Sequence, residues 1–274
     1  MFEYDSSLPL ESVLSPVEEH AKWTLHDLSY RGTQSPDVVQ AWLIVPRGSN
    51  RYPFVTFLHG GAQDRSAFLG EAALFAESGT ASLLIDLPQT RALPDFSHPD
   101  KDRAAFVQTV VGIRRGLDYL ALRSDIDISR GALVGVSFGG SIGSMVAAAD
   151  ARVRAAVLTA TPPRMSEFWR SSSHPEVVNI RRTLLSGEIE RYTESAKDLD
   201  AIECLRRISH VRFFFQFGTD DELISEQQVQ DFSLYVSDGN QFKMYESASH
   251  FEMFSNADIR QDRLLWLQNW VERA

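Results

Sequence analysis

Short apolar runs alternate with longer amphipathic segments along most of the chain, and this alternation constrains the fold more than any other feature. Short apolar runs bounded by turn residues predict buried strands, and strands that alternate with helices form parallel sheets. The expected strands are 22–30, 38–46, 54–60, 81–88, 132–136, 155–160, 211–217 and 241–246. We therefore expect an α/β fold with a mostly parallel, eight-stranded sheet, helices on both faces, and an antiparallel pair of early strands at one edge.

Helices are expected between most of these strands. The clearest one covers 101–123, where apolar residues recur every three or four positions and form one stripe that would face the sheet. The stripe consists of Phe106, Val110, Ile113, Leu117 and Leu120. The other expected helices are 66–78, 139–149, 225–236 and 257–272.

One segment, residues 163–207, interrupts the alternation. It contains no convincing strand, and it holds many charges, a run of serines and Trp169. Because strands are expected on both sides of it, we expect a helical insertion that covers the carboxyl edge of the sheet as a lid. A chain of 274 residues commonly forms one α/β domain. Residues 1–274 are therefore expected to form a single domain that carries this lid.

The charge of the chain argues against some partners. Its 27 basic and 37 acidic side chains give a formal net charge of −10, which disfavours binding to nucleic acid or to an anionic membrane. A membrane-spanning helix needs about 18 consecutive apolar residues, and no run in the sequence approaches that length. Cys204 is the single cysteine, and the first residues, MFEYDSSLPLESV, lack the basic and apolar parts of a signal peptide. We therefore expect a cytoplasmic protein.

The stretch GVSFG, residues 135–139, places Ser137 between two glycines, directly after an expected strand and before an expected helix. This context is typical of a nucleophile elbow, in which a tight turn forces the serine toward positive φ and exposes its hydroxyl above the sheet. Glycines two residues away relieve the crowding in such a turn. The alternative is an ordinary glycine-rich turn, and the hypothesis carried forward is that Ser137 is a nucleophile.

A serine nucleophile needs a base and an acid that orients the base. His250 follows the last expected strand, at the carboxyl edge where open parallel sheets bind ligands, and is the candidate base. The alternative for it is a surface-loop histidine. After the preceding strand, Asp220, Asp221 and Glu222 occur together. We expect Asp221 to be the acid, with Asp220 as the second choice, and the alternative is that one of these acids only caps the next helix.

The oxyanion of an acyl-transfer reaction needs preorganised N–H donors. The backbone amide of Phe138, at the start of a helix, is one candidate. The stretch HGGAQD, residues 59–64, follows another strand, and its glycines allow the backbone to approach a ligand closely. We expect Gly61 to supply the second donor, with Ala62 as the alternative. His59 is interpreted as a structural residue that braces this loop.

These motifs resemble those of serine α/β-hydrolases of the dienelactone-hydrolase and prolyl-oligopeptidase-like branch. The strongest stretch is RRGLDYLALRSDIDISRGALVGVSFGG, residues 114–140, which resembles the helix, D-x-x-R turn, strand and elbow of that branch. HGG at 59–61, G-x-x-D at 218–221 and the S-H pair at 249–250 match the remaining landmarks. The resemblance extends over about residues 20–273 and implies the α/β-hydrolase fold.

Two differences from that branch narrow the expected function. Dienelactone hydrolases proper use a cysteine nucleophile, whereas residue 137 is serine, so opening of a lactone ring is not implied. Oligopeptidases carry a large β-propeller, whereas only 58 residues precede His59. We expect a carboxylesterase that cleaves small or medium acyl esters through an acyl-enzyme intermediate, with no metal or organic cofactor.

The substrate is the least determined feature of the sequence. Met165, Phe168 and Trp169 in the insertion are candidates for the wall of an apolar acyl pocket, although ordinary packing of a lid uses the same residue types. The expected partner is a small-molecule acyl ester, and a homodimer through the apolar lid is an open alternative. The same triad also serves carbon–carbon bond hydrolases and acyltransferases, and a hydrolase scaffold can act as a non-catalytic ligand-binding receptor.

Overall fold

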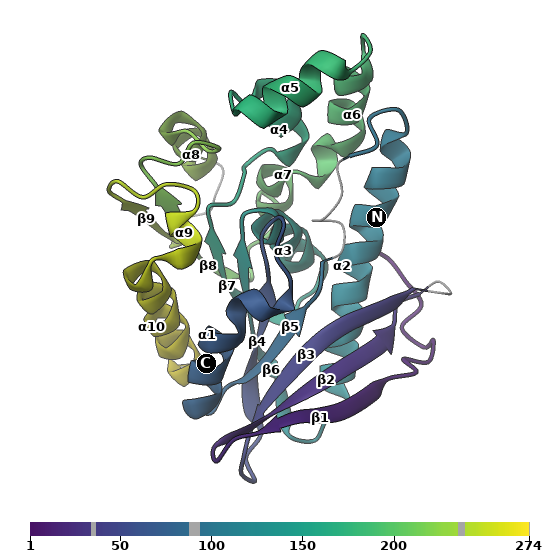
Figure 1. The fold of residues 1–274 in the computed structure, drawn as a ribbon. Coiled ribbons are helices and arrows are strands. Elements are labelled where there is room, and N and C mark those ends of the chain that lie inside the picture. The colour runs from purple at the N-terminus through teal and green to yellow at the C-terminus, as the bar shows by residue number, and fades with distance from the viewer. Residues whose placement is uncertain (34–36, 88–93, 235–238, 274) are drawn as a thin grey trace.

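A nine-stranded sheet forms the centre of the molecule, with the strand order β1-β2-β3-β5-β4-β6-β7-β8-β9 (Figure 1). The computed structural model describes residues 1–33, 37–87, 94–234 and 239–273. The strands are β1 (Val13–Glu19), β2 (Trp23–Arg31), β3 (Val38–Pro46), β4 (Tyr52–Leu58), β5 (Ala81–Ile85), β6 (Ile126–Val136), β7 (Val153–Thr159), β8 (Arg212–Gly218) and β9 (Gln241–Tyr245). Strands β5, β4, β6, β7, β8 and β9 are mutually parallel, and β1, β2 and β3 join them through antiparallel pairs.

The ninth strand corrects the expected number of eight. β1 pairs with β2 alone, at the edge of the sheet, and most of its side chains are exposed. The register of the pair shifts between Pro16 and Glu18, as is common where proline or a bulge interrupts an edge strand. An exposed strand with proline and acidic residues lacks the apolar signal of a buried one. The antiparallel pair expected at the edge, β2 and β3, therefore lies one strand inward.

Helices cover both faces of the sheet, as predicted (Figure 1). The helices of the described ranges are α1 (Leu69–Glu77), α2 (Pro99–Ala121), α3 (Phe138–Ala149), α4 (Met165–Ser171), α5 (Pro175–Thr183), α6 (Glu188–Ala196), α7 (Ala201–Leu205), α8 (Glu226–Ser233), α9 (Glu252–Ser255) and α10 (Ala257–Arg273), with the short 3₁₀ helices η1 (Arg65–Phe68) and η3 (Lys197–Leu199). One apolar core includes Leu117 of α2 and Ile142 of α3, and a second core on the other face includes Phe75 of α1 and Leu267 of α10. Residue 88 of the expected strand 81–88 and residues 235–236 of the expected helix 225–236 lie outside the described ranges.

The segment between β7 and β8 consists of α4, α5, α6, η3 and α7. Figure 1 shows α4, α5 and α6 gathered beyond one end of the sheet, beside the first turns of α2. β6 and β7 are parallel and both have their carboxyl ends at this edge of the sheet. In the described part of the chain, no helix has both the length and the apolar character that crossing a membrane requires.

Candidate active site

A strained turn between β6 and α3 carries the first site residue. Ser137 has φ 53° and ψ −118°, and a non-glycine residue held at positive φ costs about 1–3 kcal/mol. The two flanking glycines make the turn feasible. A Cβ at Gly135 would lie 2.6 Å from the carbonyl oxygen of Gly139, and a Cβ at Gly139 would clash with the carbonyl oxygen of Leu58. The chain therefore packs backbone against backbone here and projects the hydroxyl of Ser137 from the elbow.

Three side chains from separate loops meet at this elbow. Ser137 follows β6, Asp221 follows β8 and His250 follows β9, so the parallel sheet brings them to one edge. The Nε2 atom of His250 lies 2.9 Å from Oγ of Ser137, and its Nδ1 atom lies 2.8 Å from Oδ2 of Asp221. The carboxylate accepts from Nδ1–H, which leaves Nε2 as the acceptor for the serine hydroxyl. The geometry suits abstraction of the proton from that hydroxyl.

The carboxylate of Asp221 is held from its other side by the backbone. Its Oδ1 atom accepts from the N–H groups of Leu223 and Ile224, both at 2.9 Å. Asp220, the second choice from the sequence, accepts instead from the hydroxyl of Thr219 at 3.1 Å. Of the two aspartates, the structure joins Asp221 to the imidazole.

The cap of the next helix is a different residue. Ser225 accepts from the backbone N–H of Gln228, and the Gln228 side chain accepts from the N–H of Ser225. This reciprocal pair is a capping box. The acidic run ahead of α8 is therefore not needed as its N-terminal cap.

Glu222 adds a contact that the sequence reasoning missed. Its Oε2 atom accepts from the backbone N–H of His250 at 3.0 Å. Burial raises the pKa of Glu222, but the hydrogen bonds from the N–H groups of His250 and of Glu222 itself outweigh burial and lower it. The residue therefore stays ionised and fixes the loop that carries the imidazole. No sequence signal separates this role from that of its two acidic neighbours.

His59 braces the loop after β4. Its side chain is fully buried, its Nε2 accepts from the N–H of Leu87 at 2.9 Å, and its Nδ1 lies 2.9 Å from the carbonyl oxygen of Gly60. Since Nε2 is an acceptor, the proton resides on Nδ1 and donates to that carbonyl. The peptide that joins Gly60 to Gly61 is thereby fixed, and in a trans peptide the N–H of Gly61 points away from the carbonyl.

Both candidate oxyanion donors border the same space. Gly61, Ala62 and Phe138 line a cavity with Ser137 and His250. The N–H of Phe138 belongs to the first turn of α3, where helical N–H groups have no intrahelical acceptor. The loop after β4 and the start of α3 therefore both border the space that contains the serine hydroxyl.

The cavity at the elbow has a volume of about 620 Å³, within the range of small-molecule sites. The candidate pocket residues Met165, Phe168 and Trp169 all line it. Other residues in its lining were not expected there: Phe106, Asp102, His174, Glu176, Val177, Ile180, Tyr192 and Leu223. Phe106 was expected in the stripe that faces the sheet, and it is half-buried at this cavity.

Metal ions in proteins are held by sets of His, Cys, Asp or Glu side chains. Within them, no three or more His, Cys, Asp or Glu side chains are grouped so as to hold a metal ion. The site is built from a hydroxyl, an imidazole, carboxylates and backbone N–H groups.

A family model covers most of the chain. The model of a family described as "Alpha/beta hydrolase family" matches residues 57–258, which is more than half of the chain. No curated protein matches the chain.

Solved structures resemble the whole fold. An acetyl xylan esterase from Paenibacillus sp. R4 superimposes with a TM-score of 0.79 at 19% identity, over 96% of this chain and 89% of that one. Acetyl xylan esterase 1 from Thermoanaerobacterium sp. JW/SL YS485 gives 0.77 at 17% identity, over 95% and 89%. A cold-adapted esterase from an Arctic intertidal metagenomic library gives 0.64 at 15% identity, over 92% and 96%. At these identities the likeness is one of fold.

Proposed function

Because the chain belongs to the alpha/beta hydrolase family, as its motifs predicted, we propose that it is a serine carboxylesterase. It cleaves esters of small or medium acyl groups through an acyl-enzyme intermediate. The observation that carries this proposal is the continuous hydrogen-bonded chain from Asp221 through His250 to Ser137. That chain is the arrangement that activates a serine hydroxyl in acyl transfer.

Acylation begins at the hydroxyl. Oγ of Ser137 attacks the ester carbonyl carbon while Nε2 of His250 takes its proton. Asp221 holds the imidazole in the required tautomer and stabilises the imidazolium that forms. As the tetrahedral intermediate collapses, the C–O bond to the alcohol breaks, and the imidazolium gives its proton to the departing alcohol oxygen. The acyl group is then bonded to the serine.

Deacylation repeats these steps with water. The imidazole of His250 takes a proton from water, and the resulting hydroxide attacks the acyl carbon. The bond to Oγ of Ser137 breaks, Oγ recovers the proton, and the carboxylic acid leaves. The negative oxygen of both tetrahedral intermediates accepts from the N–H groups of Phe138 and Gly61, and one such donor contributes about 10²–10³ in rate.

The structural neighbours favour ester cleavage among the reactions open to such a triad. Three of them carry the word esterase in their names. Hydrolysis of carbon–carbon bonds, acyl transfer to another alcohol, and ligand binding without catalysis use the same scaffold. We further propose that residues 1–274 act as one domain with 163–207 as its lid, and that the chain works in the cytoplasm on small molecules.

Turnover of p-nitrophenyl acetate and butyrate tests the proposal. Ser137→Ala removes the attacking oxygen, so we expect kcat to fall by at least about 10³-fold. Ser141→Ala is the matched control, because Ser141 lies buried in the first turn of α3, directly after the elbow, and its hydroxyl has no hydrogen-bond partner among the described residues. This control should stay within about twofold of the wild type. Equal rates for wild type and Ser137→Ala would overturn the assignment.

A further inference from the structure

The chamber beside Ser137 is far larger than an acetyl group requires, and its walls are mainly aromatic and aliphatic. Its volume is about 620 Å³, whereas sites of 300–1,000 Å³ enclose drug-sized ligands. The larger apolar side chains that line it come from α2, the elbow, the lid and the loop after β8: Phe106, Phe138, Met165, Phe168, Trp169, Val177, Ile180 and Leu223. Such a lining stabilises apolar groups by removing them from water.

The lid side of this chamber is a packed aromatic cluster. The ring of Trp169 meets those of Phe168 and Phe96 edge-on, with centroid distances of 5.3 Å and 5.5 Å. The ring of Tyr192 packs on Phe96 at 5.1 Å. Aromatic pairs of this geometry hold their members in place. Trp169 and Phe168 therefore present a fixed apolar wall to the cavity.

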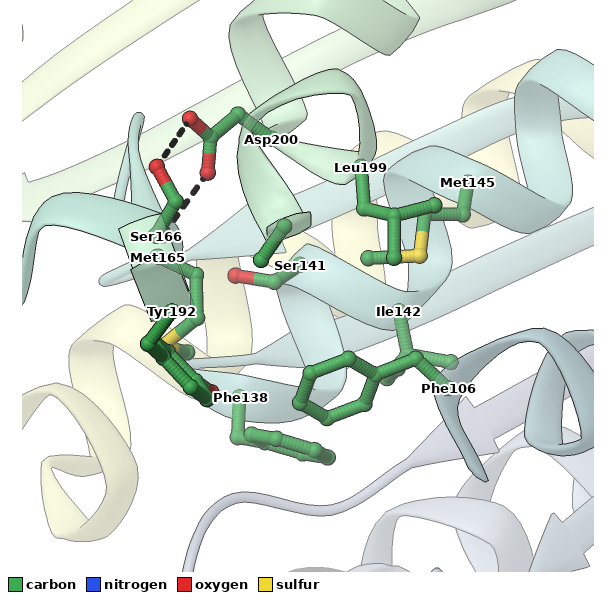
Figure 2. A pocket seen from close by; sticks show the side chains of 11 residues that line it. Phe106, Phe138, Ser141, Ile142, Met145, Met165, Ser166, Tyr192, Leu199 and Asp200 are labelled. Atoms are coloured by element: carbon green, nitrogen blue, oxygen red, sulfur yellow. Dashed lines mark hydrogen bonds between the residues drawn. The ribbon is translucent and has the colours of Figure 1, made fainter. Parts of the chain in front are cut away.

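The inner side of the chamber is equally apolar and closely packed. Phe106, Phe138, Met165 and Tyr192 line both the chamber and a second space of about 10 Å³ behind it. Figure 2 shows these four side chains around that second space, with Ile142 beside Phe106. The rings of Phe106 and Phe138 lie 5.8 Å apart. Because almost no room remains behind this wall, the free volume lies on the side that faces the serine.

Apart from His174 and His250, the charged side chains of the described lining are acidic. Asp102 and Glu176 border the chamber, and no lysine or arginine does so within the described ranges. Oδ2 of Asp102 accepts from the backbone N–H of Asp95 at 2.8 Å, which holds the carboxylate at the wall. A substrate that carries its own carboxylate meets repulsion from both groups.

We propose that the site selects uncharged esters with a bulky apolar acyl or alcohol part, either an aryl group or a chain of about six or more carbons, over acetyl esters. This inference rests on the proposed esterase function and names its substrate class. An acetyl group leaves most of the chamber unfilled, whereas a larger apolar group contacts the walls supplied by α2, α4 and α5. Each methylene buried in such a chamber raises kcat/KM by about two- to fourfold.

Two ester series test the proposal. The first varies the acyl group in p-nitrophenyl esters from acetate to octanoate and includes benzoate. The second varies the alcohol in ethyl, hexyl and benzyl acetates and is followed by acid release, because p-nitrophenol can itself fill the chamber. We expect kcat/KM to rise at least tenfold from the smallest to the six-carbon member in one series. Equal or falling values in both series overturn the proposal.

A carboxylated substrate tests the electrostatic part. The mono-p-nitrophenyl ester of adipic acid has the length of the hexanoate and adds one terminal carboxylate. We expect its kcat/KM to be at least tenfold below that of the hexanoate. Equal efficiency for the two esters overturns the selection for uncharged substrates.

A substitution that reduces the volume of the chamber tests whether the chamber causes the selectivity. Ile180→Trp places a larger side chain on the α5 wall and should lower the hexanoate-to-acetate ratio of kcat/KM at least fivefold. Leu185→Trp is the matched control, because Leu185 belongs to the same segment but is 74% exposed and lies outside the lining; its ratio should equal that of the wild type. An unchanged ratio in a folded Ile180→Trp overturns the assignment of the selectivity to this chamber. If that variant does not fold, the ester series with the wild type still tests the proposed substrate class.

These experiments distinguish failure of the proposed substrate class from failure of the proposed esterase function. Hydrolysis that depends on Ser137 but favours acetyl esters overturns the substrate class and leaves the esterase function standing. Absence of Ser137-dependent hydrolysis for every ester overturns both.

Discussion

The imidazole Nδ1 of His250 lies 2.8 Å from Oδ2 of Asp221, and each residue is only 8% exposed. In Asp221→Asn, the amide can present an N–H to Nδ1 and so favour the wrong tautomer of the imidazole. We expect kcat on p-nitrophenyl esters to fall by about 10³–10⁴-fold. Asp220→Asn is the matched control and should stay within about twofold of the wild type. A large loss in the control, with a near-normal Asp221→Asn, would transfer the role to Asp220.

His59 should affect the rate without touching the substrate. His59→Ala removes the donor that fixes the Gly60 carbonyl, so the N–H of Gly61 loses its fixed direction. We expect kcat to fall by about 10²–10³-fold, the loss expected for one oxyanion donor, with little change in KM. His210→Ala, at an exposed histidine, should leave both constants near their wild-type values. A change confined to KM, or to the thermal midpoint, would show that the brace does not serve an oxyanion donor.

The elbow glycines should be intolerant of a methyl group. In Gly139→Ala, the added Cβ meets the carbonyl oxygens of Leu58 and His59, and backbone atoms cannot rotate away. We expect the free energy of unfolding to decrease by about 1–3 kcal/mol, as measured by urea denaturation. Gly70→Ala is the control, since Gly70 is an exposed helical residue with open space around its Cβ position. It should gain about 0.5–1 kcal/mol, and an equal effect of both substitutions would contradict the close approach at the elbow.

Asp200 should make stability depend on pH. Its carboxylate accepts from the N–H and hydroxyl of Ser166 at 2.8 Å and 2.7 Å (Figure 2), and burial raises its pKa to about 6 from the ordinary value of 3.8. Between these two values, the folded state retains a proton that the unfolded state has released. The stability contributed by Asp200 is therefore present in full below about pH 4 and is lost as the pH rises to about 6.

The comparison with Asp200→Asn isolates this contribution, because asparagine is similar in shape and does not titrate. The free energy of unfolding of the wild type, minus that of the variant, should fall between about pH 4 and pH 6 and stay level above pH 7. Urea denaturation at each pH measures the difference. A difference that is constant, or that rises over this interval, would contradict the raised pKa.

Much of the sheet could be predicted because its inner strands are buried on both faces. Every side chain of β4 and β5 is buried, so their sequences are apolar apart from Thr56 and Ser82. β6 begins at Ile126, whereas the predicted strand began at residue 132. The first residues of β6 were missed because they are mostly polar and pair with β4 only ahead of a register irregularity. β1 could not be predicted, because an exposed edge strand has no buried face to constrain its residues.

The residues of the site also differ in how well the sequence predicts them. Ser137 and His250 could be predicted because a glycine-flanked turn and a loop after the last strand are local features of the sequence. Asp221 was the first choice for the acid, but Asp220 stayed open, since adjacent residues share the same sequence context and only the direction of each side chain separates them. The bond from Glu222 to the backbone of His250, and the bonds of His59, depend on contacts between distant segments.

The nucleophile is tested most directly by labelling with a fluorophosphonate, followed by mass spectrometry of the digested protein. We predict one equivalent of adduct in the wild type, located on the peptide that contains Ser137. We also predict no adduct in Ser137→Ala and much slower labelling in His250→Ala, because the imidazole no longer accepts the proton. A folded wild type that stays unlabelled, or a Ser137→Ala variant that labels at the wild-type rate, would contradict the role of Ser137 as the nucleophile.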